Sequence, residues 1–517
     1  MQEDAATQPN ADTAPSRATG RVVRDAGALM AGDVVDRGLG FVFLITATKL
    51  FGLEIYGAYQ LALAVFQIVR TLVSFGLGRS LVRDTAAASA SGDPARIKGS
   101  ILLGLAISGS LAIILGAALF FLSPTLISVV YPTHPEAIEP LRVFGLLTPL
   151  FAVNFVLLQA FYGLDRIRLM VVANNLVEPL ARLMALVSLF GLGLAGYYAL
   201  PFSYLIALVV SSIFAIVFFR RFFWRQLSGI RADYRVRETL AFTIPVTLND
   251  LATRSFRSLN IFFLAPFLSS TQLGVFSVAL KLTSVVLFFS GSLTGAFRPR
   301  IARLLAAGDI TELERETRAY NRWILTFALL PFGLLVLFPV PILNALGWQY
   351  VPVAGAMRWF AAGLLIAQSS GPLMALLLMS GRSKAPLAFF VVGGGCYTLL
   401  SVWAVPRYGV EGVAMAAFVA IVVFIPMLAV YVQRQLGISM YSRTVWKPIV
   451  AGLTAFPVGY LVSRVVPELR YVDAAAIVGA TAAVYGAVLY VLGAEREERE
   501  LLEHLLGRKS KLLKKIK

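Results

Sequence analysis

The chain has 517 residues, of which 58% are hydrophobic and only 14% are charged, a composition that excludes an ordinary soluble domain. Its formal net charge of +18 could suit nucleic acid, but the basic residues gather in alternate connections between long apolar stretches. Such an alternation marks membrane topology. The sequence therefore predicts an all-α integral membrane protein without a nucleic-acid partner.

Apolar stretches of about 20 residues, the length that crosses a bilayer, recur from position 26 almost to position 493. Boundaries at charges, prolines and glycines divide them into about 14 predicted transmembrane helices. These lie near 27–48, 56–78, 99–122, 140–163, 169–190, 197–219, 239–265, 272–295, 321–343, 354–380, 386–405, 410–432, 446–463 and 474–492. The first and the seventh are the least certain, because both carry internal charges.

The predicted helices group into two lobes with flanking segments. In chain order we expect a disordered leader (1–25), a six-helix lobe (26–219), a basic linker (220–238), a second six-helix lobe (239–433), two extra helices (434–492) and a basic amphipathic tail (493–517). The positive-inside rule places both termini in the cytoplasm of a plasma (inner) membrane. The tail is expected to bind anionic lipid, with an ordinary solvated helix as the alternative.

An internal duplication relates the two lobes. Each motif recurs 217 residues later in the chain, as from position 33 to position 250. The repeated motifs are Asp33-x-x-x-Arg37 with Asp250-x-x-x-Arg254, and Gly57-x-Tyr59-x-x-Ala62 with Gly274-x-Phe276-x-x-Ala279. Because each unit contains six helices, both copies keep the same orientation, related by a pseudo-two-fold axis along the membrane normal.

Charged side chains inside the apolar helices predict a hydrated cavity between the lobes. One Arg or Lys at mid-bilayer costs about 2.5–3.5 kcal/mol, so several of them are hard to sustain facing lipid. The cations predicted to form one anion site are Arg37, Arg70, Arg254, Arg257 and Lys281. They outnumber the acids on the same helices, and a surplus of cations favours an anionic cargo. Arginine suits phosphate because its planar fork binds two oxygens at once.

Other polar residues on the same helical faces complete the predicted site. The candidates for gating or ion coupling are Asp33, Asp36, Asp250 and Glu178, and the candidate neutral cavity residues are Gln60, Gln67, Ser277 and Ser284. The repeated Asp–Arg pairs are expected to face each other across the cleft, each acid holding its arginine. The alternative is a helix-packing ion pair of i,i+4 spacing, and it is favoured for Glu178–Arg182.

Signals of catalysis are weak. The two histidines, His134 and His504, lack metal-ligand spacing, and the single cysteine, Cys396, excludes an internal disulfide. We therefore predict no catalytic residue, no metal ligand and no cofactor, and a protein that is not an enzyme. Coupling of transport to H⁺ or Na⁺ is left open.

Two motifs stand inside this six-plus-six repeat. They are Tyr56-Gly57-Ala58-Tyr59-Gln60-Leu61-Ala62 and Gly76-Leu77-Gly78-Arg79-Ser80-Leu81-Val82-Arg83. With them, residues 25–490 resemble the multidrug/oligosaccharidyl-lipid/polysaccharide (MOP) exporter superfamily, in its polysaccharide-transport branch. The resemblance implies two lobes whose cavity opens alternately to each side. In the related lipid II flippases, an acid and cations on the first, second and eighth helices correspond to Asp36, Arg37, Arg70 and Lys281, and the last two helices line a groove for the lipid tail.

The resemblance implies a flippase that moves an oligosaccharide linked to a polyprenyl (di)phosphate from the inner to the outer leaflet, for cell-surface polysaccharide biosynthesis. We expect the protein to be a monomer. Its expected partners are this glycan lipid and a glycan polymerase or glycosyltransferases that associate with it. A cation-coupled exporter of drugs or metabolites is the first alternative, and the surplus of cations argues against it. A membrane glycosyltransferase or polymerase is the second, opposed by short outer loops without clustered carboxylates.

Overall fold

The computed structural model describes residues 14–224, 227–287, 297, 300–301, 303–305, 307–368, 370–380, 382, 384–439, 446–465 and 472–492. Side chains are described for these residues except 14–26, 30, 224, 249, 252–258, 384, 386–387 and 472–473. Within these ranges the secondary structure is helical, with no strand. The predicted all-α class is therefore confirmed.

The helices follow one another with short connections. The first part of the chain forms α1 (Ala14–Leu50), α2 (Gly52–Ser74), α3 (Leu77–Ala90), α4 (Pro94–Val130), η1 (Pro135–Ala137), α5 (Ile138–Gly163), α6 (Ile167–Val171), the π-helical segment η2 (Val172–Val177), α7 (Glu178–Gly191), α8 (Ala199–Phe219) and η3 (Arg220–Trp224). The second part forms α10 (Val236–Leu264), α11 (Ser270–Thr283), η4 (Ser284–Leu287), α13 (Ile310–Leu337), α14 (Pro339–Leu346), η5 (Trp348–Val353), α15 (Ala354–Ala367), α16 (Ser370–Met379), α17 (Lys384–Leu436), α18 (Trp446–Val465) and α19 (Val472–Leu492).

In the described ranges, eleven helical segments are long and apolar enough to cross a membrane. The two charged helices α1 and α10 correspond to the first and seventh predicted spans. The eleventh and twelfth predicted spans run together in α17, across a kink at Gly409, where φ is 52° and glycine avoids the strain of a Cβ. The multi-span membrane architecture is confirmed, whereas the number fourteen stays a prediction.

The ends of the chain differ in part from expectation. The leader predicted to be disordered over residues 1–25 is already helical from Ala14, where α1 begins. Pro15 stands in the first turn, where proline is tolerated, and the following Ala and Arg residues have high helix propensity. Residues 1–13 and the predicted amphipathic tail (493–517) lie outside the described residues.

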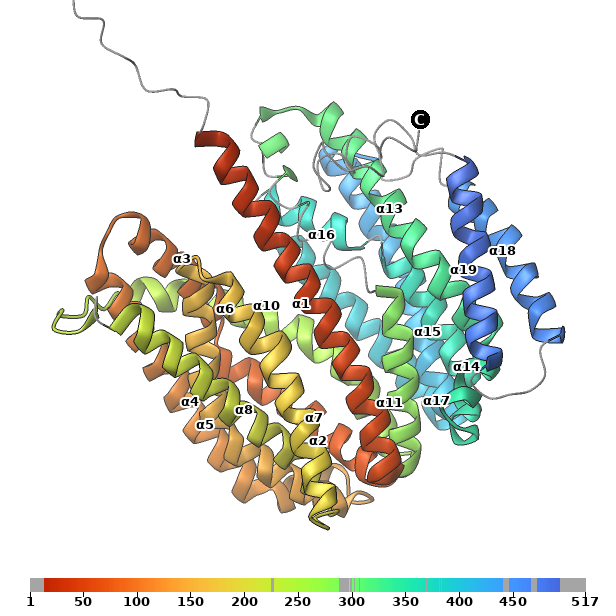
Figure 1. Ribbon diagram of the computed structural model, residues 1–517, viewed down its shortest axis with the longest axis horizontal. Coiled ribbons are helices and arrows are strands. Elements are labelled where there is room, and N and C mark those ends of the chain that lie inside the picture. The colour runs from red at the N-terminus through yellow and green to blue at the C-terminus, as the bar shows by residue number, and fades with distance from the viewer. Residues whose placement is uncertain are drawn as a thin grey trace, which may run out of the picture.

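The helices form two bundles with α1 between them (Figure 1). One bundle, the N-terminal lobe, contains α2 to α8. The other, the C-terminal lobe, contains α10 to α17, and its first helix, α10, also packs against α2 and α3 of the N-terminal lobe. The last two helices, α18 and α19, pack against α13 and α14 on the side of the C-terminal lobe that faces away from the N-terminal lobe. Their position outside the two lobes agrees with the two extra helices of the prediction.

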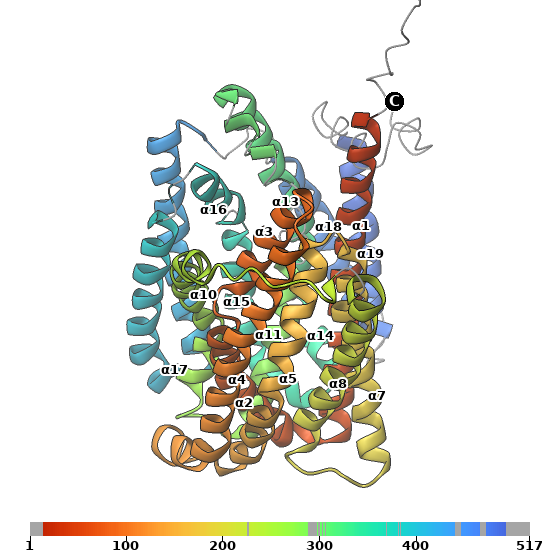
Figure 2. The same ribbon diagram turned by 90° about the vertical axis from the view of Figure 1, so that its left-hand side faces the viewer.

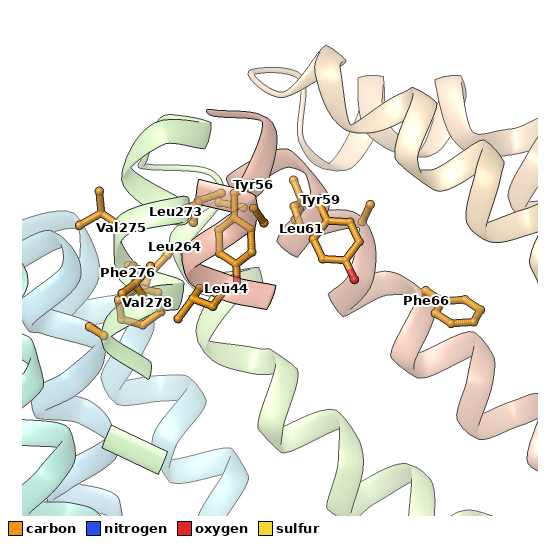
Figure 3. Close-up of a cluster of buried hydrophobic side chains, with 14 of the residues drawn as sticks. Leu44, Tyr56, Tyr59, Leu61, Phe66, Leu264, Leu273, Val275, Phe276 and Val278 are labelled. Atoms are coloured by element: carbon orange, nitrogen blue, oxygen red, sulfur yellow. The ribbon is translucent and has the colours of Figure 1, made fainter. Parts of the chain in front are cut away.

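The lobes meet where α1 turns into α2, a region that we term the junction end. Here α2 and α11 touch through Gly57 and Gly274, the glycines that the sequence repeat aligns. A Cβ on Gly57 would overlap the backbone carbonyl of Ser270, and one on Gly274 would overlap that of Leu53. One hydrophobic core surrounds this contact and takes side chains from both lobes, such as Tyr56 of α2 and Phe276 of α11 (Figure 3). The junction end is therefore tightly closed.

The linker runs along the N-terminal lobe before α10 begins (Figure 2). The ammonium of Lys98 donates a hydrogen bond of 2.9 Å to the carbonyl of Ile230, and the N–H of Asp233 donates one of 3.0 Å to the carbonyl of Ala95. Both acceptor–donor pairs join the linker to the start of α4. The chain is thus attached to the N-terminal lobe almost until Val236 starts α10.

Candidate functional site

The charges in the middle of α1 lie beside Lys281 of α11. A Cβ placed on Gly40 would be 3.1 Å from the Lys281 Nζ, and this nitrogen is 6.0 Å from the ring centroid of Phe41. Lys281 interacts electrostatically with Asp36 and Arg37 of α1. The structure therefore brings together three residues that were predicted from the first and eighth helices.

The other predicted acid of α1, Asp33, turns toward the N-terminal lobe. Its carboxylate accepts a hydrogen bond of 3.2 Å from the side-chain amide of Asn175 in η2. The neighbouring Asn174 donates to the Asn175 amide oxygen at 2.9 Å and so orients that amide. The sequence predicted that Asp33 would hold Arg37. The contact with Asn175 could not be foreseen, because it depends on the π-helical turn of η2 and on close packing at Gly32.

A second group of charges surrounds Glu178 at the start of α7. Glu178 interacts electrostatically with Arg70 of α2, with Arg182 of α7 and with Asp36. The Arg70 guanidinium lies 4.7 Å from the ring centroid of Phe151. Arg70 has no acid one turn away on α2, so this cation–π contact helps to stabilise its positive charge in an apolar environment.

Arg182 has contacts that the spacing argument did not predict. Besides its interaction with Glu178, its guanidinium donates a hydrogen bond to the Tyr59 hydroxyl. It also lies 4.1 Å from the ring centroid of Phe43 and 4.7 Å from that of Tyr204. These rings come from three different helices, so i,i+4 spacing within α7 could not reveal them. Arg182 also interacts with Asp36 and Lys281.

These residues form one electrostatically connected group, which we name the central charged cluster. Its members are Asp33, Asp36, Arg37, Arg70, Glu178, Arg182 and Lys281. When all are ionised, four cations face three acids, which leaves one net positive charge. The cluster joins α1 to both lobes, through Arg70 and Arg182 of the N-terminal lobe and Lys281 of the C-terminal lobe.

The predicted site residues of α10 are not part of this cluster as described. Asp250 is ion-paired with Arg79 of α3, at 2.8 Å, whereas the sequence predicted Arg254 as its partner. Asp33 and Asp250 thus each have a partner in the N-terminal lobe, and the arrangement in which Asp33–Arg37 and Asp250–Arg254 face each other stays a prediction. The side chains of Arg254 and Arg257 lie outside the described residues, so their membership in the anion site stays a prediction.

The predicted neutral residues divide into two kinds. Gln60 and Gln67 are half-buried on α2. Ser277 is 3% exposed and donates to the Leu273 carbonyl at 2.8 Å, and Ser284 donates to the Lys281 carbonyl at 2.6 Å. Ser277 is therefore buried in helix packing in this state, and its role as a cavity residue stays a prediction. Hydroxyls in apolar helices commonly bond to the preceding turn in this way.

Replacing Gly40 by Ala tests whether the position of Lys281 matters. The new methyl group would press on the Lys281 Nζ, and we expect the transport rate to fall severalfold, up to about tenfold, because small displacements of a positioned group reduce rates strongly. Gly38→Ala is the matched control, since a Cβ there meets no atom within 4 Å. Both changes raise helix propensity equally. Equal transport rates in the two purified variants would show that the Lys281 position is unimportant.

Comparison with known proteins agrees with this architecture. Residues 22–305, more than half of the chain, match the family described as polysaccharide biosynthesis protein. Stage V sporulation protein B of Bacillus subtilis (strain 168) is 23% identical over 508 residues, which cover 93% of this chain and 97% of that protein.

Solved structures share the fold at low sequence identity. The lipid II flippase MurJ, in an inward closed conformation, has a TM-score of 0.70 and 12% identity, covering 90% of this chain and 98% of that one. A multidrug resistance MATE family transporter of the MOP superfamily, in an inward-facing conformation, has a TM-score of 0.64 and 16% identity, covering 79% and 94%. The chain therefore belongs to the polysaccharide biosynthesis protein family, in the polysaccharide-transport branch of the MOP exporter superfamily.

Proposed function

We propose that this protein is a flippase that carries an oligosaccharide linked to a polyprenyl (di)phosphate from the inner to the outer leaflet by alternating access. The central charged cluster is the observation that carries this proposal. Its cations come from α1, α2, α7 and α11, and its net positive charge favours an anionic headgroup over a cationic drug. Three arginines offer the planar donor pairs that fit phosphate oxygens. Translocation requires no covalent step and therefore no catalytic residue.

The direction of transport follows from the distribution of basic residues. The linker and the connections on the same side of the bundle carry most of the Lys and Arg, so this side faces the cytoplasm and the junction end faces outward. In this orientation, lobes that touch at the junction end are closed toward the outside, and the Arg79–Asp250 ion pair also joins α3 and α10 on the inner side. Headgroup capture would occur from the inner side with the junction end closed, and the lobes would then separate at the junction end to release the cargo.

The acids of the cluster provide for release of the cargo. Asp33, Asp36 and Glu178 compete with phosphate for the neighbouring cations, so the headgroup is not bound permanently. The same acids are the candidates for coupling to H⁺ or Na⁺. Asp250, which pairs with Arg79 across the lobes, acts as a gating contact between α3 and α10. During binding the cations of the cluster contact the phosphate, and during release they contact the acids again.

A transport assay with purified protein in vesicles of known orientation tests the proposal. A fluorescent short glycan on a polyprenyl diphosphate is supplied on the face that carries the linker, and an impermeant quencher reports how much of it has crossed. We expect the label to become protected only when the protein is present. Absence of movement, together with uptake of organic cations by the same vesicles, would favour a drug exporter and overturn the assignment.

A further inference from the structure

One side chain of the N-terminal lobe joins the two lobes at the junction end. His134, in the connection after α4, is fully buried, with 0% of its surface exposed. Its Nε2 is 2.7 Å from the carbonyl oxygen of Ala265, at the end of α10, and its Nδ1 is 2.8 Å from the Ser270 Oγ, at the start of α11. Both ring nitrogens are therefore bonded to the C-terminal lobe.

The local chain fixes the imidazole in this position. The N–H of His134 donates to the Tyr131 carbonyl at 2.9 Å, and the His134 carbonyl accepts from the Ala137 N–H at 3.0 Å. The Tyr131 ring stacks on Phe262 of α10, with centroids 6.4 Å apart. The connection is thus a rigid turn that presents His134 to the other lobe.

A carboxylate completes the contact. Glu136 Oε1 is 3.3 Å from the His134 Nδ1 and also accepts a hydrogen bond from the Ser270 hydroxyl. Since a backbone carbonyl can only accept, the Nε2 of His134 must carry a proton. The remaining three groups, Nδ1, the hydroxyl and the carboxylate, contact one another pairwise.

The number of protons in this group decides whether the contacts attract or repel. With neutral His134 and ionised Glu136, only the hydroxyl proton is available for three contacts, so lone pairs face each other at Nδ1 and the carboxylate. One further proton removes this conflict. Nδ1–H then donates toward Ser270 and Glu136, while the Ser270 hydroxyl donates to Glu136, and a cation faces an anion in a buried site.

We propose that His134, Glu136 and Ser270 form a proton-dependent lock of the outer gate, which holds the junction end closed while it retains one additional proton. The inference rests on the proposed function, because it assigns the junction end to the outer gate of a transport cycle. The closed contacts are all satisfied only when this proton is present, so conditions that remove it favour opening.

Few other charged side chains lie near the contact of His134, Glu136 and Ser270. Residues 258–280 of the C-terminal lobe contain no Asp, Glu, Lys or Arg. The helices of the N-terminal lobe that pack against η1 are α2, α4 and α5. Their ionisable side chains nearest to the junction end are Glu54, Tyr131, Glu139 and Arg142. Tyr197 donates a hydrogen bond to Glu54. Within these residues, Glu136 is the carboxylate that contacts His134. The lock is therefore expected to respond chiefly to the His134–Glu136 pair.

Distances between spin labels on the outer ends of the lobes test the lock. Leu192 and Trp348 are suitable positions because they are 74% and 73% exposed at the junction end of the two lobes. Both are changed to Cys in the full-length protein with Cys396→Ala. In membranes at acidic pH we expect one short distance, and as the pH is raised a growing population of longer distances.

Two variants give opposite expectations. His134→Gln removes the titrating ring, so the longer distance should be present at every pH. Glu136→Gln supplies an amide that donates to Ser270, which then donates to neutral His134, so all contacts form without the additional proton and the short distance should persist at high pH. His504→Gln, which changes the other histidine of the chain, is the control and should keep the wild-type pH response.

A wild-type pH response that survives in both His134→Gln and Glu136→Gln would overturn the lock, as would a distance that does not change with pH. These outcomes are separable from failure of the proposed function. The distances report the outer gate without any cargo, whereas the vesicle assay reports movement of the glycan lipid.

Discussion

Gly57→Ala is expected to abolish transport and to shift the protein toward a state in which the junction end is separated, and Gly274→Ala is expected to do the same. Each methyl group would overlap a backbone carbonyl of the facing helix, and a backbone cannot give way as a flexible side chain can. Overpacking of this kind costs about 1–3 kcal/mol, which lowers the ratio of closed to separated lobes by about fivefold to 150-fold. Loss of helix propensity cannot explain the effect, because Ala is the better helix former.

Glycan transport in vesicles and the Leu192–Trp348 label distance measure the two consequences together. Gly109→Ala on α4 is the matched control, since a Cβ there meets no atom within 4 Å, and this variant should behave as wild type. Normal transport in Gly57→Ala would mean that the contact between α2 and α11 is not required in the cycle.

The double variant Arg70→Ala, Lys281→Ala is expected to lose glycan transport while the protein still inserts into the membrane. Each cation is a donor to a charged headgroup, and such a hydrogen bond contributes about 1.5–3 kcal/mol, or about tenfold to a hundredfold in affinity. Arg70→Lys should restore only part of the activity, because an ammonium cannot bind two phosphate oxygens as a planar fork does.

Binding of a polyprenyl diphosphate to the purified variants measures the loss directly. Arg464→Ala on α18 is the control, because this exposed arginine bonds only to Tyr460 within the described contacts and stands away from the central charged cluster. If the double variant binds and transports the lipid as the control does, the cluster is not the headgroup site.

The sequence was most informative where periodicity and repetition decide the structure. Hydropathy indicated a multi-span helical membrane protein, and the two glycines that the repeat aligns, Gly57 and Gly274, lie in contact at the junction end. The spacing of Asp36, Arg37 and Lys281 predicted a shared polar interior, and the structure places these residues together. In each case the signal is local or is duplicated in the chain, so no knowledge of tertiary packing was needed.

Partners chosen by tertiary packing could not be predicted. Asp250 pairs with Arg79, which is 171 positions away, and Asp33 pairs with Asn175, which is 142 positions away. Spacing of i,i+4 shows that two residues share a helical face, but it does not show which neighbour that face meets. His134 illustrates the same limit, because its main partner is a backbone carbonyl, which has no sequence signature.

The attachment of the linker to α4 has a mechanical consequence. With the Asp233 N–H bonded to Ala95, the free tether that leads into α10 is the stretch from Asp233 to Val236. A fully extended chain covers about 3.6 Å per residue, so this tether reaches about 11 Å at most. The start of α10 can swing around this anchor but cannot travel far from it. A wider stroke of the lobes at this end must first break the Asp233–Ala95 hydrogen bond, so this backbone contact limits the amplitude of the motion.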